Sequence, residues 1–183
     1  MGKNKKICWG ITGAGDYILE TIEIMEKIRK EYDFKITIII STEGVTVLKW
    51  YKLLNKLQET FEDVRIEKGP NIPFIIGPLQ TGSYKFLFVS PLTGNSTAKV
   101  ALGIADTLIT NAISQTMKGN IPVYVYPVDQ KEGELTTILP NGKKLTLKSR
   151  KIDLQHVENL RKMDGIEVLS HPNEILEIIK KYL

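Results

Sequence analysis

Short runs of β-branched and apolar residues alternate with helical patterns along the whole chain. The predicted strands cover residues 6–12, 35–40, 85–90, 121–126 and 167–169, and shorter strand-like runs lie at 64–67 and 74–76. Helical patterns cover residues 16–31, 46–60, 94–118, 153–163 and 172–182. This alternation predicts an α/β fold in which a doubly wound, Rossmann-like parallel sheet is the middle of three layers.

The hydrophobic spacing inside these elements indicates how they pack. In the first helix, apolar residues recur at Ile18, Ile22, Met25 and Ile28, which places them on one helical face. The strand at 35–40 is almost entirely β-branched and apolar, which is typical of a parallel strand covered on both faces. The sequence shows no internal repeat or linker, and its 183 residues fit one domain, predicted to span residues 1–183.

One segment departs from the alternation of strands and helices. Two strand-like runs at 135–139 and 143–147 flank the dipeptide Asn141-Gly142. Asn and Gly tolerate the positive φ that a tight hairpin turn requires. The pattern predicts a β-hairpin that projects from the sheet.

Composition and charge narrow the function classes. The chain is 42% hydrophobic and 25% charged, as expected of a globular protein. Its 25 basic and 21 acidic residues give a net charge of +4, but the two kinds are interleaved, so no nucleic-acid partner is expected. The longest apolar run, at 36–40, is far below the ~18 residues of a membrane helix. The first residues are typical of a strand rather than a signal peptide, so we expect no membrane association and a cytoplasmic location.

The single cysteine and the two histidines indicate neither thiol nor metal chemistry. Cys8 lies within an apolar strand pattern, which favours a buried structural thiol over a nucleophile. His156 and His171 are distant from it and lack metal-ligand spacing. We therefore expect no metal site.

The residues that directly follow the first two strands are candidates for phosphate binding, because ligands bind beyond the carboxyl ends of parallel strands. Gly13, Ala14 and Gly15 let backbone amides approach an anion at a helix N-terminus, and Ser41 and Thr42 add hydroxyl groups. A dinucleotide fingerprint would have a third glycine where Ile18 stands, so NAD is disfavoured. An ordinary turn and a helix cap explain these residues equally well.

Two carboxylates near the candidate residues are interpreted as structural. Asp16 beside a phosphate would be repulsive, so we interpret it as a helix cap turned away from the ligand. Asp106 shares a face of the predicted helix 94–118 with Lys99. An internal Lys99–Asp106 network is favoured over a catalytic acid at this position.

The strongest candidate segment opens the helix predicted at 94–118. It carries more hydroxyl and amide groups than one helix cap requires. Its residues are Ser90, Pro91, Leu92, Thr93, Gly94, Asn95 and Ser96, and Thr97, Ala98 and Lys99 follow.

Three blocks of sequence, at 10–16, at 90–112 and at 153–172, resemble the homo-oligomeric flavin-containing cysteine decarboxylase superfamily, most closely its archaeoflavoprotein branch. The middle block is the specific one, because the superfamily sequence Pro-Ala-Ser-Ala-Asn-Thr aligns without a gap to residues 91–96. The resemblance implies a flavodoxin-like fold, FMN as cofactor, contacts from residues 93–96 to FMN, and a phosphate and ribityl site at residues 13–15 and 41.

Departures from the superfamily limit which activity is expected. The sequence has no histidine before His156 and reads Pro127-Val128-Asp129-Gln130 where the decarboxylases have Pro-Ala-Met-Asn, which disfavours decarboxylation. Val128 stands where flavin prenyltransferases have an arginine. Asp106 and Asp129 are the available acids. Trp9, Trp50 and Tyr51 are candidates to stack on the flavin, although core or interface roles are favoured for them and for Tyr124 and Tyr126.

The resemblance that remains implies an FMN-dependent redox protein, and more closely an oxidoreductase similar to dihydromethanopterin reductase. FMN would take electrons from a ferredoxin-like donor and pass them to an acceptor such as a dihydropterin. The alternatives are an FMN-binding carrier module without turnover of its own and a divergent flavin prenyltransferase. The superfamily further implies a homo-oligomer, a trimer or a multiple of trimers.

Overall fold

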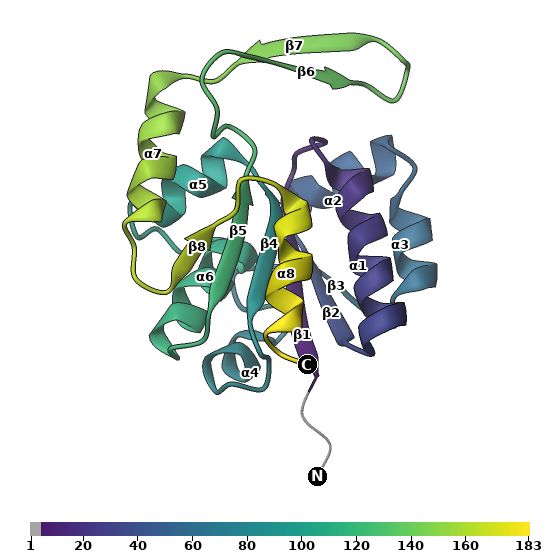
Figure 1. The fold of residues 1–183 in the computed structure, drawn as a ribbon, viewed down its shortest axis with the longest axis vertical. Coiled ribbons are helices and arrows are strands. Elements are labelled where there is room, and N and C mark those ends of the chain that lie inside the picture. The colour runs from purple at the N-terminus through teal and green to yellow at the C-terminus, as the bar shows by residue number, and fades with distance from the viewer. Residues whose placement is uncertain (1–4) are drawn as a thin grey trace.

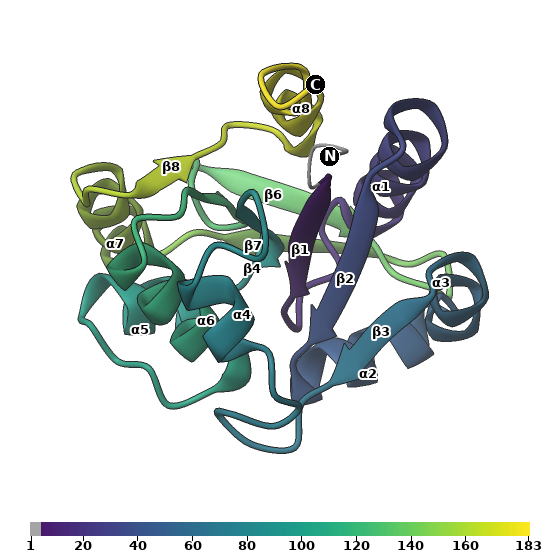
Figure 2. The same ribbon diagram turned by 90° about the horizontal axis from the view of Figure 1, so that it is seen from below.

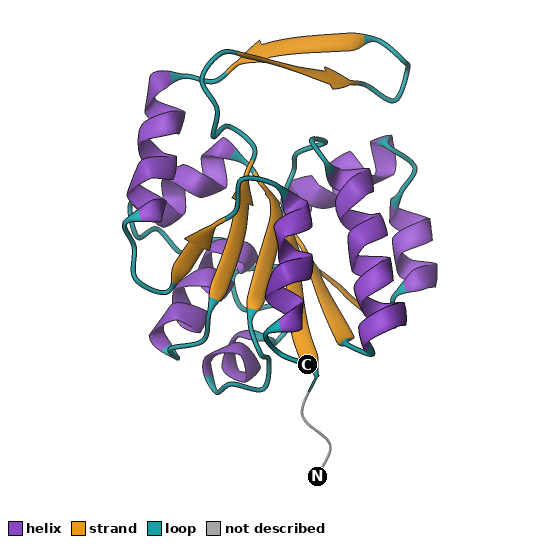
Figure 3. Ribbon diagram, viewed as in Figure 1, coloured by secondary structure: helices purple, strands orange, loops and turns teal. Residues whose placement is uncertain are grey.

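A six-stranded parallel sheet forms the centre of the molecule (Figures 1 and 3). A computed structural model describes residues 5–183, so the first four residues of the predicted domain lie outside it. The strand order β3-β2-β1-β4-β5-β8 confirms the predicted doubly wound sheet. The strands are β1 (Lys6–Ile11), β2 (Lys35–Ile40), β3 (Asp63–Ile66), β4 (Leu87–Leu92), β5 (Val123–Pro127) and β8 (Ile166–Val168).

Helices cover both faces of this sheet, as the end-on view shows (Figure 2). One core contains residues of α1 (Ile18–Tyr32), α2 (Thr42–Trp50), α3 (Leu54–Thr60) and α8 (Ile175–Lys180). The other contains residues of α4 (Ile76–Gln80), α5 (Gly94–Ala101), α6 (Leu108–Lys118) and α7 (Lys151–Arg161). A short 3₁₀ turn, η1 (Pro172–Glu174), precedes α8.

Successive residues of the central strands supply the two cores in turn. In β4, Phe88 packs into the core beside α1, whereas Leu87 and Val89 pack into the core beside α6. In β1, Trp9 packs into the core beside α1, and its neighbour Cys8 packs into the core beside α6. Since side chains alternate across a strand, a strand between two helical layers is apolar at nearly every position, and the buried exceptions Thr37 and Ser90 have hydrogen-bonded hydroxyl groups.

The predicted hairpin is present as β6 (Glu134–Ile138) and β7 (Lys144–Lys148). It forms its own two-stranded antiparallel sheet and crosses above the carboxyl ends of the main strands (Figure 1). Gly142 adopts a φ of 78° at the turn, as the Asn-Gly dipeptide predicted. Every residue of β7 is exposed, in contrast to the fully buried β4.

Two predicted helices are each broken in two. The helix expected at 94–118 is instead α5 and α6, separated by a loop in which Gly103 has a φ of 73° and Thr107 begins a new capping box. The helix expected at 46–60 starts earlier, at Thr42, and breaks near Lys52, whose φ is 58°. The strand-like run at 74–76 forms no strand, because Phe74 lies in a loop and α4 begins at Ile76.

Within residues 5–183, no helix is long and apolar enough to cross a bilayer.

Candidate functional site

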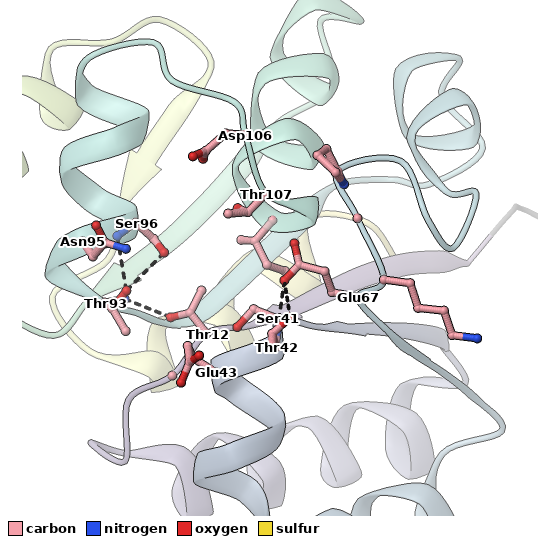
Figure 4. Close-up of a pocket in the computed structure, with 15 residues that line it drawn as sticks. Thr12, Ser41, Thr42, Glu43, Glu67, Thr93, Asn95, Ser96, Asp106 and Thr107 are labelled. Atoms are coloured by element: carbon pink, nitrogen blue, oxygen red, sulfur yellow. Dashed lines mark hydrogen bonds between the residues drawn. The ribbon is translucent and has the colours of Figure 1, made fainter.

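A cavity of about 520 Å³ lies where the carboxyl ends of β1, β2 and β4 meet (Figure 4). This is the position at which open parallel sheets bind ligands. Hydroxyl, amide and carboxylate groups from several loops converge on it. Its walls are formed by Thr12, Gly13, Ser41, Thr42, Glu43, Glu67, Lys68, Gly69, Pro70, Thr93, Asn95, Ser96, Asp106, Thr107 and Ile109.

Thr12 joins the loop after β1 to the loop after β4. Its hydroxyl donates to the Pro91 carbonyl at 2.7 Å and accepts from the Thr93 backbone N–H at 2.9 Å. The next residue, Gly13, is pressed against α2, since a Cβ there would lie 2.7 Å from the Glu43 Cβ. A larger residue at position 13 would therefore push the loop and α2 apart.

The N-terminus of α5 is capped from within the strongest predicted segment. The Thr93 hydroxyl accepts from the Ser96 backbone N–H at 3.2 Å and donates to the Ser96 Oγ at 3.1 Å. Ser96 therefore keeps its own hydroxyl proton for a ligand. Figure 4 places Asn95 and Ser96 together at this end of the cavity.

The N-termini of α2 and α6 share one carboxylate. Glu67 accepts from the Thr42 backbone N–H at 2.9 Å and from the Leu108 backbone N–H at 2.6 Å. Ser41 caps α2 by accepting from the Gly44 N–H at 3.0 Å. A side-chain anion thus already occupies two helix N-termini at the rim of the cavity, as the partial positive charge of such termini favours.

The two acids named from the sequence differ in their surroundings. Asp106 is paired with Lys99, with Nζ 2.8 Å from Oδ2, and the hydrogen bond lowers the pKa of the carboxyl group. This pair confirms the predicted network, although Asp106 lies in the loop between α5 and α6 rather than on a helix. Burial, followed by the charges of Asp153 and Asp16, raises the pKa of Asp129, which lies against Gly94 at the start of α5. Asp129 is therefore the acid of the two that more readily holds a proton.

The interpretation of Asp16 as a helix cap is wrong. Helix α1 begins at Ile18, and its N-cap residue is Tyr17, in the left-handed region with a φ of 56° and without a side-chain cap. The Asp16 carboxylate instead accepts a hydrogen bond from the Thr137 hydroxyl on the hairpin. The contact joins residues 121 positions apart.

The twelve residues predicted to bind the cofactor occupy three kinds of position. Gly13, Ser41, Thr42, Thr93, Asn95 and Ser96 line the cavity. Ala14, Gly15 and Gly94 are their chain neighbours in the same loops. Ser90, Pro91 and Leu92 are buried at the end of β4, behind the residues that line the cavity. Contact between these residues and a cofactor stays a prediction.

Sequence reasoning missed Glu67 and Thr12. Glu67 directly follows β3, so the rule that selected Ser41 would also have selected it had the short strand been given equal weight. Thr12 is nearly buried, and its role depends on Pro91 and Thr93, which are about eighty positions away.

The aromatic candidates lie mostly in the core. Trp9 is fully buried and donates through Nε1 to the Ser90 carbonyl at 2.8 Å. Tyr124 and Tyr126 are also buried. Trp50 is 52% exposed, and the neighbouring Tyr51 covers Gly15. The core role favoured for the three buried aromatics is confirmed.

The thiol is placed as expected. Cys8 is fully buried, and burial raises its pKa well above the usual range for a thiol, so it stays protonated. In the part of the chain that the structure describes, no group of His, Cys, Asp and Glu side chains is arranged to hold a metal ion.

Comparisons with known proteins agree with this fold. The model of the flavoprotein family matches residues 1–181. An uncharacterized protein of Methanocaldococcus jannaschii is 50% identical over 97% of this chain and 96% of its own length. The dihydromethanopterin reductase (acceptor) of the same organism is 32% identical over 97% of this chain and 96% of its own.

Among solved structures, DmrB of Burkholderia xenovorans in complex with FMN, described as a cubic protein cage for redox transfer, superposes with a TM-score of 0.82. It is 27% identical, and the alignment covers 99% of this chain and 96% of that one. A dodecameric FMN-dependent decarboxylase of Escherichia coli O157:H7, at 16% identity and a TM-score of 0.65, shares the fold over 89% of this chain and 78% of its own. The chain belongs to the flavoprotein family.

Proposed function

We propose that this chain is a single-domain FMN-dependent redox protein that holds FMN in the cavity at the carboxyl ends of β1, β2 and β4. The observation that carries the proposal is the convergence of the N-terminus of α5 and the hydroxyl groups of Ser41, Thr93 and Ser96 on one cavity. Helix N-termini and hydroxyl groups are the groups that bind a phosphate. Membership of the flavoprotein family adds the identity of the ligand.

The residues present fit an FMN phosphate and ribityl chain. The Ser41 and Ser96 hydroxyls each accept one intramolecular hydrogen bond and keep a proton to donate. The Gly13 loop approaches α2 so closely that a Cβ would be strained there, and Gly13 itself lines the cavity. The residues proposed to bind FMN are Gly13, Ala14, Gly15, Ser41, Thr42, Ser90, Pro91, Leu92, Thr93, Gly94, Asn95 and Ser96, with the last three residues of β4 acting from beneath as support.

Bound FMN supplies the redox chemistry, and the chain supplies binding and electrostatics. Asp106 is held as an anion by Lys99, so it contributes charge rather than a proton. Asp129, beside the first residue of α5, is the carboxyl group whose surroundings favour a bound proton. We therefore assign any proton delivery near the start of α5 to Asp129, which does not itself line the cavity.

We further propose a ferredoxin-like donor and, as acceptor, a dihydropterin. The pterin is supported by the archaeal relative that is named a dihydromethanopterin reductase and aligns with nearly the whole chain. A homo-oligomer built from trimers is proposed on the resemblance of the sequence, and DmrB of B. xenovorans forms a cage. Turnover of a dihydropterin with a reductant separates an enzyme from a carrier module, and conversion of FMN with a prenyl phosphate would instead indicate a prenyltransferase.

The first test is the visible spectrum of the purified protein followed by anaerobic photoreduction. Flavin bands that bleach on reduction are expected. A colourless protein that also fails to bind added FMN would overturn the proposal.

A substitution tests the site. Asn95→Leu should weaken FMN binding by about tenfold or more while the protein stays folded, because it removes a hydrogen-bonding group at the cavity. Asn55→Leu is the matched control, since Asn55 is likewise an exposed second residue of a helix, α3, and does not line the cavity. The measurement is FMN affinity by fluorescence quenching. Unchanged affinity in Asn95→Leu would show that the site is wrongly placed.

A further inference from the structure

The stretch that runs from the second strand of the hairpin into the start of α7 is strongly basic. Residues 143–151 contain five of the 25 basic residues and none of the 21 acidic ones, so the remainder of the chain carries a formal charge of −1. Arg150 is paired with Asp153 at 2.7 Å. The other four, Lys143, Lys144, Lys148 and Lys151, are exposed. The basic surface is defined here as these four lysines.

The hairpin has two different faces. Thr137 bonds to Asp16, so the face that Thr137 shares with Leu135, Leu145 and Leu147 is turned toward the body of the molecule. Since side chains alternate, Lys144 and Lys148 project from the opposite face. Glu134 lies opposite Lys148 in the register, and no ion pair joins any of the four lysines to another described residue.

The hairpin is held beside the candidate cofactor site. Besides the bond from Thr137 to Asp16, the Tyr51 hydroxyl donates to the Ile138 carbonyl at 3.5 Å. Tyr51 in turn covers Gly15, in the loop that begins at Gly13 on the cavity wall. Figure 1 shows the hairpin extending over this end of the sheet. A protein that contacts the outer face of the hairpin would therefore lie near the cofactor.

We propose that the basic surface is the docking site of an acidic electron-donor protein. This inference rests on the proposed redox function, which requires a donor. Complementary charge raises the association rate of transient encounters, and electron-transfer complexes have small interfaces. Each one-electron donor is oxidised once, so two donor molecules reduce one FMN, which gains two electrons and takes up protons from solvent.

Two other partners are less well matched to this surface. Residues 134–148 contain no aromatic side chain, so the hairpin offers no platform for stacked bases. Leu145 and Leu147 lie on the face opposite Lys144 and Lys148, and of the exposed apolar residues of the two strands only Ile138 shares the face of these lysines. One apolar side chain beside the charges is too little to hold the hairpin in a lipid surface.

The test measures reduction of the FMN-loaded protein by a reduced, acidic [2Fe–2S] ferredoxin in an anaerobic stopped-flow instrument. The hairpin variant carries Lys143→Gln, Lys144→Gln and Lys148→Gln, none of which changes a proposed cofactor-binding residue. At low ionic strength its second-order rate should be about tenfold lower than that of the wild type, and its rate should fall less steeply with added salt. Reduction by dithionite should be unchanged.

The matched control carries Lys30→Gln, Lys118→Gln and Lys162→Gln. These exposed lysines lie at or just beyond the C-terminal ends of α1, α6 and α7. In Figure 1 those helix ends point away from the hairpin. The net charge changes equally in the two variants, and the control should stay within about twofold of the wild type. A loss of equal size in the control would show that net charge, not the hairpin, sets the rate.

Other outcomes would also overturn the proposal, and they separate it from the proposed function. If dithionite bleaches the flavin and the ferredoxin does not, docking is wrong and the redox function stands. If neither reductant bleaches a bound flavin, the redox function itself fails. Docking is equally wrong if the hairpin variant keeps the wild-type rate but loses binding to phosphatidylserine vesicles, or changes its oligomeric state in size-exclusion chromatography.

Discussion

The sheet and the hairpin are both built from β-strands, yet they are specified in different ways. Strand β4 is buried along its whole length and packs into both cores. Strand β7 is exposed along its whole length, and the Thr137–Asp16 and Tyr51–Ile138 contacts hold the hairpin to the body. Burial fixes the position of β4 in the sheet, whereas the Asn-Gly turn and a few polar contacts fix the position of the hairpin.

This difference shows which part of the molecule is free to vary in surface chemistry. A residue of β4 is apolar or, like Ser90, has its polar group hydrogen-bonded, since both faces of the strand meet helices. A residue of β7 has no such restriction, and four lysines occupy the strand and its flanks. The body thus provides a rigid cofactor site, and the hairpin provides a surface that can be matched to a partner.

The largest expected loss of stability comes from a substitution in the core of the sheet. Phe88→Ala should lower the free energy of unfolding by about 3–5 kcal/mol, because it leaves a cavity at a fully buried position. Leu147→Ala, on the hairpin and 60% exposed, should cost less than about 0.5 kcal/mol. Urea denaturation measures both, and losses of similar size would contradict the contrast between sheet and hairpin.

A smaller loss of stability is expected from a substitution in the closely packed loop at Gly13, on the wall of the cavity. Gly13→Ala should destabilise the fold by about 1–3 kcal/mol and weaken FMN binding, because the new methyl group would lie against the Glu43 Cβ. Gly69→Ala is the control, since Gly69 also lines the cavity but a Cβ there meets no atom within 4 Å. Thermal unfolding with and without FMN compares them. Equal behaviour of the two variants would remove the argument for a close-fitting loop.

The smallest expected loss of stability concerns the Arg150–Asp153 ion pair, at the point where the hairpin joins α7. Arg150 holds the pKa of the buried Asp153 carboxyl below its usual range. The stabilisation is therefore present at neutral pH and lost as the pH falls through that lowered pKa. Asp153→Asn should cost about 1–2 kcal/mol at pH 7, and the difference from the wild type should shrink under acid conditions.

Glu158→Gln supplies the comparison for this substitution. Glu158 pairs with Arg161 at the same three-residue spacing on α7, but it is exposed. Its loss should cost less than about 0.5 kcal/mol at any pH. Denaturation profiles at several pH values should separate the two variants, and a pH-independent deficit in Asp153→Asn would mean that its charge is not the cause.

The elements with strong local patterns could be predicted from the sequence. The apolar runs of β1 and β2 and the Asn-Gly turn of the hairpin each carry their own signal. The break between α5 and α6 does not, because Ala and Gly residues around Gly103 are compatible with a slim continuous helix. Only the positive φ of Gly103 and the new cap at Thr107 divide the segment.

The residues of the candidate site likewise include some that a local pattern indicates and some whose contacts only the folded chain reveals. Ser41, Thr93 and Asn95 follow strands or open helices, so local position was enough to select them. The partners of Asp16 and Glu67 could not be predicted, because Thr137 and Leu108 approach them only in the folded chain. Polar contacts across long sequence separations leave no periodic signal.

The carboxylate of Glu67 has a consequence for the energetics of cofactor binding. By satisfying the first N–H groups of α2 and α6, it keeps both helix ends in place without a ligand. Little of the binding free energy is then consumed in ordering the protein, which is the thermodynamic advantage of preorganisation. The apoprotein should be a folded receptor, and FMN should stabilise it only by mass action, in proportion to the logarithm of its concentration.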